Sequence, residues 1–332
     1  MFPPSPRLRI FTWHIHGSYL YYLVQSPHEF YIPVKADKSE GYYGRTESYP
    51  WPENLHEIPA EEVRDQDFDC ILFQTRKNYL EDQYEILSPR QRELPRVYLE
   101  HDPPWGDPTN SRHWVDDPDI LLVHVTHFNQ LMWDNGQTPT RVIEHGVLIP
   151  DTAKFTGEKE RGLVIVNNLH SRGRRLGLDL FEEIRKEIPL ALVGINAHEL
   201  DGLASLSHRE LLELEGHYRF VFNPIRYTSL GLAICEAMMV GMPIIGLATT
   251  EMVTTIENGV SGYIDTNVET LIPHMKRLLV EPVEAQQLGA GARRQALKRF
   301  NIQRFASDWS DTFLSVTGLK MEAPTPQVQE VE

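Results

Sequence analysis

Cysteine is scarce in this chain of 332 residues, which contains only Cys70 and Cys235. Two cysteines cannot build a disulfide framework or a four-ligand zinc site. This scarcity is typical of proteins in a reducing compartment, so we expect a cytoplasmic protein.

Positive charge is also in deficit. The chain has 32 lysine and arginine residues against 47 aspartate and glutamate residues, which gives a net charge of −15. Nucleic acids and anionic membrane surfaces both attract proteins with a positive field. We therefore expect neither as a partner, although a local basic patch could still bind a small phosphate ligand.

Long apolar runs are missing as well. No stretch approaches the roughly 18 apolar residues that a membrane-spanning helix needs. The segment Met1–Arg9 contains three prolines and no apolar core, so it lacks the pattern of a signal peptide. We expect no transmembrane segment.

What remains is an ordinary globular composition, with 41% hydrophobic and 24% charged residues. Short β-rich apolar runs alternate with helical stretches, most clearly in the second half, and this rhythm predicts an α/β fold with doubly wound parallel sheets. The runs predicted as strands are Leu8–Trp13, Cys70–Phe73, Arg96–Leu99, Ile120–Val125, Arg141–Glu144, Leu163–Val166, Leu190–Val193, Phe220–Phe222, Pro243–Gly246 and Tyr263–Ile264.

The chain length favours two domains. The pattern breaks into Pro, Asp, Thr and Lys around Leu148–Glu160, as exposed linkers do. We therefore predict a first domain over residues 1–150, a second over 151–301, a last helix over 302–319 and a disordered tail over 320–332. The segment Tyr31–Pro59, rich in Tyr, Pro and Gly, is predicted to be irregular.

The segment Asn223–Gly246 carries the most informative pattern: a strand, a loop, a helix, a tight turn and another strand. Gly231 opens the helix, and the lack of a Cβ lets backbone N–H groups approach an anion. The helix N-terminus adds free donors and about half a positive charge. Glu236 follows about one turn later, where its carboxylate could accept hydrogen bonds from a ribose diol.

This segment resembles the retaining GT-B glycosyltransferases of the family-4 type, in which it reads roughly P-S-x-x-E-G-F-G-L-x-x-x-E-A-x-A-x-G-x-P. The matching positions are Pro224, Gly231, Leu232, Glu236, Ala237, Gly241 and Pro243. The resemblance covers about residues 161–316 well and the first half more loosely. It implies two Rossmann-like domains facing each other across a cleft, with the last helix crossing back to the first domain.

The resemblance implies a nucleotide-diphosphate sugar donor on the second domain. Glu236 would bind the ribose, and the backbone of Gly231 and Leu232 would meet the diphosphate. Two positions depart from the family: Thr228 replaces the glutamate that contacts the transferred sugar, and Ser229 replaces a glycine. These changes leave the sugar open and could mark a loss of catalysis.

A basic cluster is the second candidate element. The family places an arginine and a lysine over the diphosphate, and the arginine position is Asn168 here. Arg172, Arg174 or Arg175 could take the cationic role, because guanidinium groups pair well with phosphate. Arg175 fits best by its distance from Gly177, and the alternative is a solvated basic helix start.

In the first half, His101 matches the family's histidine beside the reacting sugar. It could bind the sugar or help to position the acceptor, or it could be an ordinary strand-end histidine. Gly17 and Ser18, after the first strand, match a glycine-rich loop that faces the cleft and could offer backbone donors. His145 matches the family's linker-side turn and is predicted to be architectural.

No metal site is predicted. The spacing of His14 and His16 suits a metal, but no third ligand is evident. The pair His124 and His127 also lacks a third ligand and is predicted to be structural. The segment Asp116–Asp119 resembles an Asp-x-Asp metal motif but precedes a strand, where an acidic turn is expected.

These observations predict a glycosyltransferase of the hexosyltransferase type, which moves a sugar from a nucleotide-diphosphate donor to an acceptor hydroxyl. The family implies retention of configuration and chemistry that needs no metal or further cofactor. The acceptor could be a glycan, a small molecule or a protein. Two alternatives stay open: a non-catalytic GT-B binding module or partner subunit, for which Thr228 is the best support, and a nucleotide-sugar epimerase.

Overall fold

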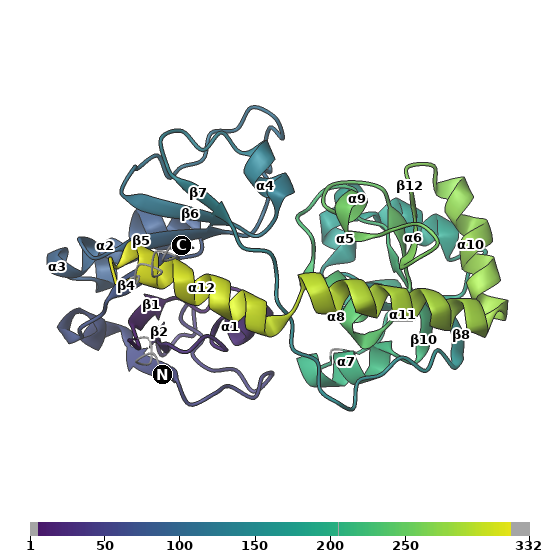
Figure 1. The fold of residues 1–332 in the computed structure, drawn as a ribbon, viewed down its shortest axis with the longest axis horizontal. Coiled ribbons are helices and arrows are strands. Elements are labelled where there is room, and N and C mark those ends of the chain that lie inside the picture. The colour runs from purple at the N-terminus through teal and green to yellow at the C-terminus, as the bar shows by residue number, and fades with distance from the viewer. Residues whose placement is uncertain (1–5, 205, 320–332) are drawn as a thin grey trace, which may run out of the picture.

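The computed structural model describes residues 6–204 and 206–319, and it divides the chain between two β-sheets. The sheets and their helices lie side by side along the long axis of the molecule (Figure 1). Strands β1–β7 form the sheet of the first domain, and strands β8–β12 form the sheet of the second. Neighbouring strands run parallel throughout both sheets, so the predicted α/β class with two parallel sheets is confirmed.

The first sheet has seven strands in the order β3-β2-β1-β4-β5-β6-β7. Its strands are β1 Arg9–Thr12, β2 Glu29–Val34, β3 Leu55–Pro59, β4 Cys70–Phe73, β5 Arg96–Glu100, β6 Ile120–His124 and β7 Thr140–Val142. Every residue of β4 is buried, as expected of a central parallel strand covered on both faces.

The prediction that the segment Tyr31–Pro59 is irregular is wrong at both ends of the segment. Strand β2 begins before it and continues to Val34, and β3 closes it at Pro59. Pro33 lies inside β2 and is paired in register with Ile58 of β3. The loop expected after the first strand is also different, because Gly17 and Ser18 form the first turn of helix α1 (Gly17–Leu23).

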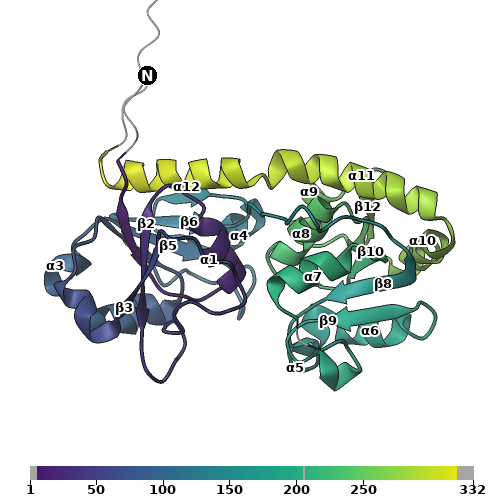
Figure 2. The same ribbon diagram turned by 90° about the horizontal axis from the view of Figure 1, so that it is seen from below.

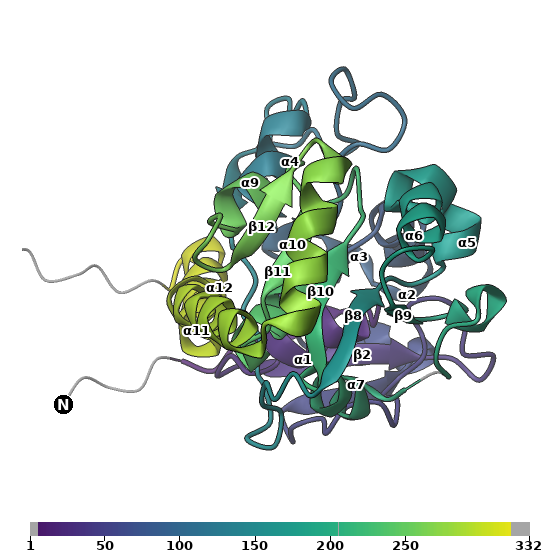
Figure 3. The same ribbon diagram turned by 90° about the vertical axis from the view of Figure 1, so that its right-hand side faces the viewer.

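The second sheet has five strands in the order β12-β11-β10-β8-β9. Its strands are β8 Lys159–Ile165, β9 Leu190–Val193, β10 Tyr218–Asn223, β11 Ile244–Leu247 and β12 Gly262–Asp265. Figure 3 faces this domain, with α11 to the left of the sheet and α5 and α6 to the right. Helices therefore cover the sheet on two sides, as in a doubly wound fold.

The helices of the first domain are short. Besides α1 they are η1 Ala60–Asp65 (a 3₁₀-helix), η2 Asn78–Asp82 (a π-helix), α2 Gln83–Ile86, α3 Pro89–Arg92 and α4 His127–Met132. Those that follow β8 are α5 Leu169–Arg172, η3 Gly173–Leu176, α6 Leu178–Ile184, η4 Ala197–Leu200, α7 His208–Glu215, α8 Leu232–Val240, α9 Met252–Thr255, α10 Val268–Val280, α11 Pro282–Arg299 and α12 Ile302–Val316.

The last two helices lie along both domains. Figure 2 shows α11 along the second domain and α12 continuing along the first. Trp309 of α12 is fully buried and donates its indole N–H to the hydroxyl of Tyr19 at 3.1 Å. The Phe313 ring packs at 6.2 Å from the Phe30 ring of β2. Helix α12 therefore completes the core of the first domain.

Candidate functional site

A cleft of about 520 Å³ lies between the two domains and takes lining residues from both. It borders the carboxyl ends of β1, β5, β8 and β10, which is where doubly wound sheets bind ligands. The predicted residues that line it are His101, Gly17 and Ser18 from the first domain, and Arg172, Thr228, Ser229, Gly231, Leu232 and Glu236 from the second. Asn168, Arg174 and Arg175 are not among its lining residues.

The N-terminus of α8 opens into this cleft. No side chain caps it, and its first turn contains no acidic residue. Gly231 has φ −70° and ψ 141°, which any residue can adopt, and apart from its chain neighbours no described residue has an atom within 4 Å of the place where a Cβ would stand. The glycine therefore matters here for the open space in front of the helix, where an anion could meet the free N–H groups.

The carboxylate of Glu236 is buried at the wall of the cleft and already has two donors. Its Oε1 accepts a hydrogen bond from the Tyr22 hydroxyl at 2.7 Å and another from His208 Nε2 at 2.9 Å. Tyr22 belongs to α1 of the first domain, whereas His208 begins α7 of the second. Burial and the nearby carboxylate raise the pKa of Tyr22 well above its usual value. The hydroxyl is therefore a neutral donor that joins the two domains at this carboxylate.

The three arginines of the basic cluster have different surroundings. The Arg172 side chain lines the cleft. Arg175 stacks on the exposed ring of Trp105, with its guanidinium carbon 3.3 Å from the ring centroid, and the same ring lies 5.3 Å from Arg172. Arg174 instead forms an ion pair with Asp179.

Asn168, the position of the family's arginine, adopts the left-handed conformation with φ 54° before α5. Its Oδ1 accepts a hydrogen bond from Asn196 Nδ2 at 2.8 Å. The neighbouring Asn167 lines the cleft instead. Of the basic cluster and Asn168, Arg172 is therefore the side chain that the structure brings to the cleft.

His101 is held at the end of β5 with its side chain in the cleft wall. Its Nε2 is 3.1 Å from Oε1 of Gln74. The ring of Tyr19 stands perpendicular to it at 4.8 Å between centroids, and the ring of His16 lies at 4.2 Å. Burial lowers the pKa of His101 well below 6.5 and that of His16 to about 4, so both rings are neutral near pH 7.

The turn with His145 lies where the chain passes from the first domain to the second. His145 Nε2 donates a hydrogen bond at 2.8 Å to the carbonyl of Leu230, the residue before Gly231. Arg304 of α12 donates to the carbonyls of Glu144, at 2.9 Å, and His145, at 2.5 Å. The turn is therefore tied both to the last helix and to the loop that opens α8.

The side chains whose spacing suits a metal ion instead make hydrogen bonds to nearby residues. His14 Nδ1 lies 2.6 Å from the Gly44 carbonyl, and His124 Nε2 lies 2.8 Å from Asn135 Oδ1. Asp117 Oδ1 accepts the N–H of Asp119 at 2.9 Å, as in an acidic turn. Within residues 6–204 and 206–319, no three His, Cys, Asp or Glu side chains gather as metal ligands would.

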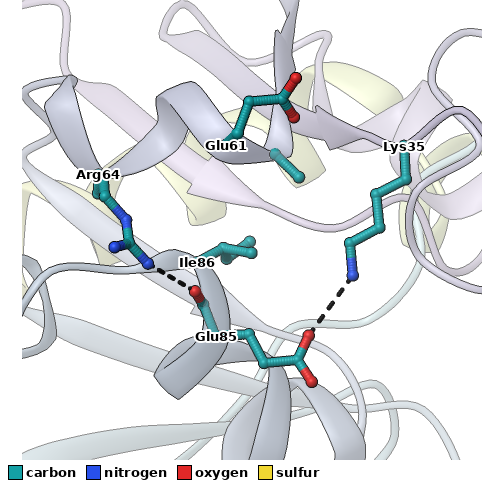
Figure 4. A pocket seen from close by; sticks show the side chains of 6 residues that line it. Lys35, Glu61, Arg64, Glu85 and Ile86 are labelled. Carbon is teal, nitrogen blue, oxygen red and sulfur yellow. Dashed lines mark hydrogen bonds and ion pairs between the residues drawn. The ribbon is translucent and has the colours of Figure 1, made fainter.

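A second hollow of about 460 Å³ lies on the first domain. Lys35, Glu61, Arg64 and Glu85 line it, and Glu85 binds Lys35 at 3.4 Å through its side chain and Arg64 at 2.8 Å through its carbonyl (Figure 4). None of the residues predicted for the site lies there.

Sequence reasoning missed Tyr22, Gln74 and His208. Gln74 contacts His101, and Tyr22 and His208 contact Glu236. Tyr22 and His208 are separated from Glu236 by 214 and 28 residues along the chain, and no local motif marks either pairing. Gln74 directly follows a strand that was predicted, which is the one signal that pointed to it.

No protein-family model matches the chain. Among curated proteins, a trehalose synthase from Pyrococcus horikoshii is 22% identical over 167 residues, which are 42% of this chain and 40% of that protein. The matched part therefore spans less than half of that relative.

Solved structures resemble most of the chain. A sucrose-phosphate synthase from Thermosynechococcus elongatus has a TM-score of 0.69 at 15% identity, over 95% of this chain and 100% of that one. HepE from Anabaena, in complex with UDP and glucose, has a TM-score of 0.68 at 13% identity, over 93% and 100%. A glycosyltransferase from Rickettsia africae has a TM-score of 0.62 at 13% identity, over 93% and 98%. The predicted GT-B fold is confirmed. No helix of the described residues is long and apolar enough to cross a membrane.

Proposed function

We propose that this GT-B chain is a glycosyltransferase, which moves a sugar from a nucleoside-diphosphate donor to an acceptor hydroxyl. The observation that carries the proposal is that Glu236, the open N-terminus of α8 and Arg172 line one wall of a single cleft. A carboxylate suits the hydroxyls of a ribose, and the helix N-terminus and the guanidinium suit a diphosphate. The first domain closes the opposite wall, where an acceptor would enter.

The leaving nucleoside diphosphate would be stabilised by donors that are already in place. Negative charge develops on it as the bond to the sugar breaks. Arg172 and the first N–H groups of α8 face the space it would occupy. Removing one such donor typically raises the barrier by about 3 kcal/mol, roughly a hundredfold in rate. The proposal therefore includes no metal ion, and activity should persist in EDTA.

The donor is proposed to be a uridine diphosphate sugar. The support comes from HepE, whose structures hold UDP, UDP and glucose, or UDP-glucose. Retention of configuration is part of the proposal and rests on the family resemblance of the segment around Glu236. The transferred sugar would meet Thr228, which lines the cleft and offers a hydroxyl where the family has a carboxylate.

Calorimetric titration with UDP, GDP, ADP and dTDP tests the donor site. We expect selective micromolar binding of UDP and a loss of about 10- to 100-fold in affinity for Glu236→Ala, since hydrogen bonds to a charged group contribute about 1.5–3 kcal/mol. Glu213→Ala is the matched control, because this carboxylate on α7 binds Thr152 and Arg209 and does not line the cleft. If the wild type binds none of the four nucleotides, the proposal is wrong.

Thr228 favours a second candidate, a non-catalytic module that binds the same nucleotide. A hydroxyl carries no charge, so this position lacks the group that contacts the transferred sugar in the family. Turnover separates the two functions. Hydrolysis or transfer of a UDP-sugar that falls about a hundredfold in Arg172→Ala supports the enzyme, whereas binding of UDP without any turnover supports the module.

A further inference from the structure

We propose that Gln74 is a positioning residue that fixes the tautomer of His101, so that Nδ1 is left as a hydrogen-bond acceptor for a hydroxyl group in the cleft. Gln74 is buried directly after β4, next to the end of β5 where His101 lies. The nucleotide contacts described above do not involve it. The identity of the hydroxyl as a sugar hydroxyl rests on the proposed function, whereas the tautomer does not.

The orientation of the Gln74 amide follows from its partners. Its nitrogen lies 2.8 Å from the carbonyl oxygen of Trp13 and 2.9 Å from Oγ1 of Thr12. A carbonyl oxygen can only accept, so the atom facing Trp13 must be the NH₂ group of the amide. The Thr12 hydroxyl can accept at the same time, because it donates its own proton to the Leu72 carbonyl at 2.9 Å. The amide oxygen of Gln74 is therefore the atom that faces His101.

The tautomer of His101 follows in turn. Its Nε2 lies 3.1 Å from that amide oxygen, which can only accept. Nε2 must therefore carry the proton. Burial, together with His16 and His145, lowers the pKa of His101 well below 6.5, so the ring holds one proton and Nδ1 keeps its lone pair.

The ring is also fixed in place. Asn129 of α4 donates to the His101 carbonyl at 3.1 Å, and Trp133 donates to the carbonyl of Asp102 at 2.9 Å. The perpendicular ring of Tyr19 packs against the imidazole. Backbone and side chain are thus held from separate elements, which is the arrangement that pre-organises a binding group.

The Nδ1 atom of His101 is free to bind one kind of ligand group. Among the described residues, Nδ1 has no hydrogen-bond partner, and the partly exposed ring lines the cleft. A lone pair accepts a hydrogen bond from a hydroxyl group, whereas an ionised carboxylate or phosphate has no hydrogen to donate. The group that meets Nδ1 is therefore a hydroxyl group of the ligand rather than a carboxylate or a phosphate.

Nitrogen-15 NMR of protein labelled at histidine tests the tautomer directly. The His101 signals are assigned by their loss in His101→Asn. We expect the wild type to show protonation at Nε2 and none at Nδ1 near pH 7. A wild-type spectrum with the proton on Nδ1, or with two protons on the ring, would overturn the inference without any variant.

A substitution at Gln74 tests its part. Gln74→Met removes the acceptor, so both tautomers should become populated. Gln83→Met is the matched control, because Gln83 is an equally buried glutamine that binds only the Tyr79 carbonyl. If Gln74→Met keeps the single wild-type tautomer, Gln74 does not set it.

Measurements of UDP binding and of turnover in the Gln74 variant then test whether the tautomer of His101 matters for the proposed function. If half of the molecules lose the accepting atom, kcat/KM for a neutral UDP-sugar should fall about twofold, because only the fraction with the accepting tautomer reacts. Affinity for UDP should stay unchanged, because His101 does not touch the nucleotide site. Failure to bind UDP would refute the proposed function alone, and an unchanged kcat/KM in a variant with mixed tautomers would refute the role of Nδ1.

Discussion

Replacing Tyr22 by phenylalanine removes the hydroxyl through which the first domain reaches Glu236. Tyr22 is fully buried, and its hydroxyl lies 2.7 Å from Oε1 of the carboxylate. Phenylalanine keeps the ring and its packing, so the change is confined to the contacts of the hydroxyl with Glu236 and, at 3.2 Å, with His208 Nε2. Glu236 retains His208 as a donor at 2.9 Å.

A hydrogen bond to a charged group contributes about 1.5–3 kcal/mol to stability. Because His208 remains at the same oxygen, we expect the lower figure for Tyr22→Phe, about 1.5 kcal/mol. For domains of this size, each kcal/mol corresponds to about 2–4 °C in Tm, so the expected loss is about 3–6 °C. Differential scanning calorimetry measures it, with each transition treated separately because the chain has two domains.

Tyr21→Phe is the matched control. Tyr21 neighbours Tyr22 in α1, its ring lies 5.6 Å from that of Tyr49, and its hydroxyl has no hydrogen-bond partner among the described residues. Its Tm should therefore stay close to that of the wild type. Equal Tm values for the two variants would show that the contact with Glu236 contributes nothing.

A double-mutant cycle with Glu236→Ala isolates the pair. If the two side chains interact as the structure shows, the double variant should be more stable than the sum of the single changes predicts, by about 1.5 kcal/mol. Unconnected residues add within about 0.3–0.5 kcal/mol. A coupling inside that range would refute the reasoning.

Two further predictions concern buried groups beside the cleft. Both carboxylate oxygens of Glu215 are buried and have no hydrogen-bond partner among the residues that the structure describes, and burial, with Glu236 nearby, raises the pKa of Glu215 well above 4.5. The folded state therefore holds this proton more tightly than the unfolded state, so stability is lost as pH rises above about 4.5. Glu215→Gln has no carboxylate to ionise, so it should not lose this stability. The difference in Tm between Glu215→Gln and the wild type should therefore grow as the pH rises above about 4.5. Tm curves that stay parallel would contradict the raised pKa of Glu215. His145→Ala should weaken binding of UDP by about tenfold through loss of the bond to the Leu230 carbonyl, while His145→Gln, which can place a nitrogen donor there, should bind within about threefold of the wild type. Equal titration curves for the two variants would show that this bond does not position α8.

Local patterns were enough to predict the elements around the proposed donor site. Helix α8 begins directly after Gly231, as predicted, and α7 likewise begins at a clear local signal. Ser207 and Glu210 form a capping box before α7, and Gly231 precedes α8. Strands β4 and β9 were likewise visible as continuous apolar runs.

The parts that the sequence did not reveal depend on how distant elements meet. Pro33 suggested an irregular segment, yet β2 accommodates it in the sheet beside β3. Tyr22 reaches Glu236 only because the first domain lies against α8. Arg175 and Trp105 also come from different domains, and Arg175, the best candidate of the basic cluster, stacks on this ring and is not among the residues that line the cleft. No local periodicity encodes such contacts.

Helix α12 has a consequence for the order in which the chain folds during synthesis. Trp309 and Phe313 pack into the first domain against Tyr19 and Phe30, although they are made after the whole second domain. The ribosome therefore releases the second sheet before the first domain has received its final core residues. Domains usually complete folding in the order of synthesis. Here we expect the reverse, with the first domain exposing the surface for α12 until α12 has been synthesised.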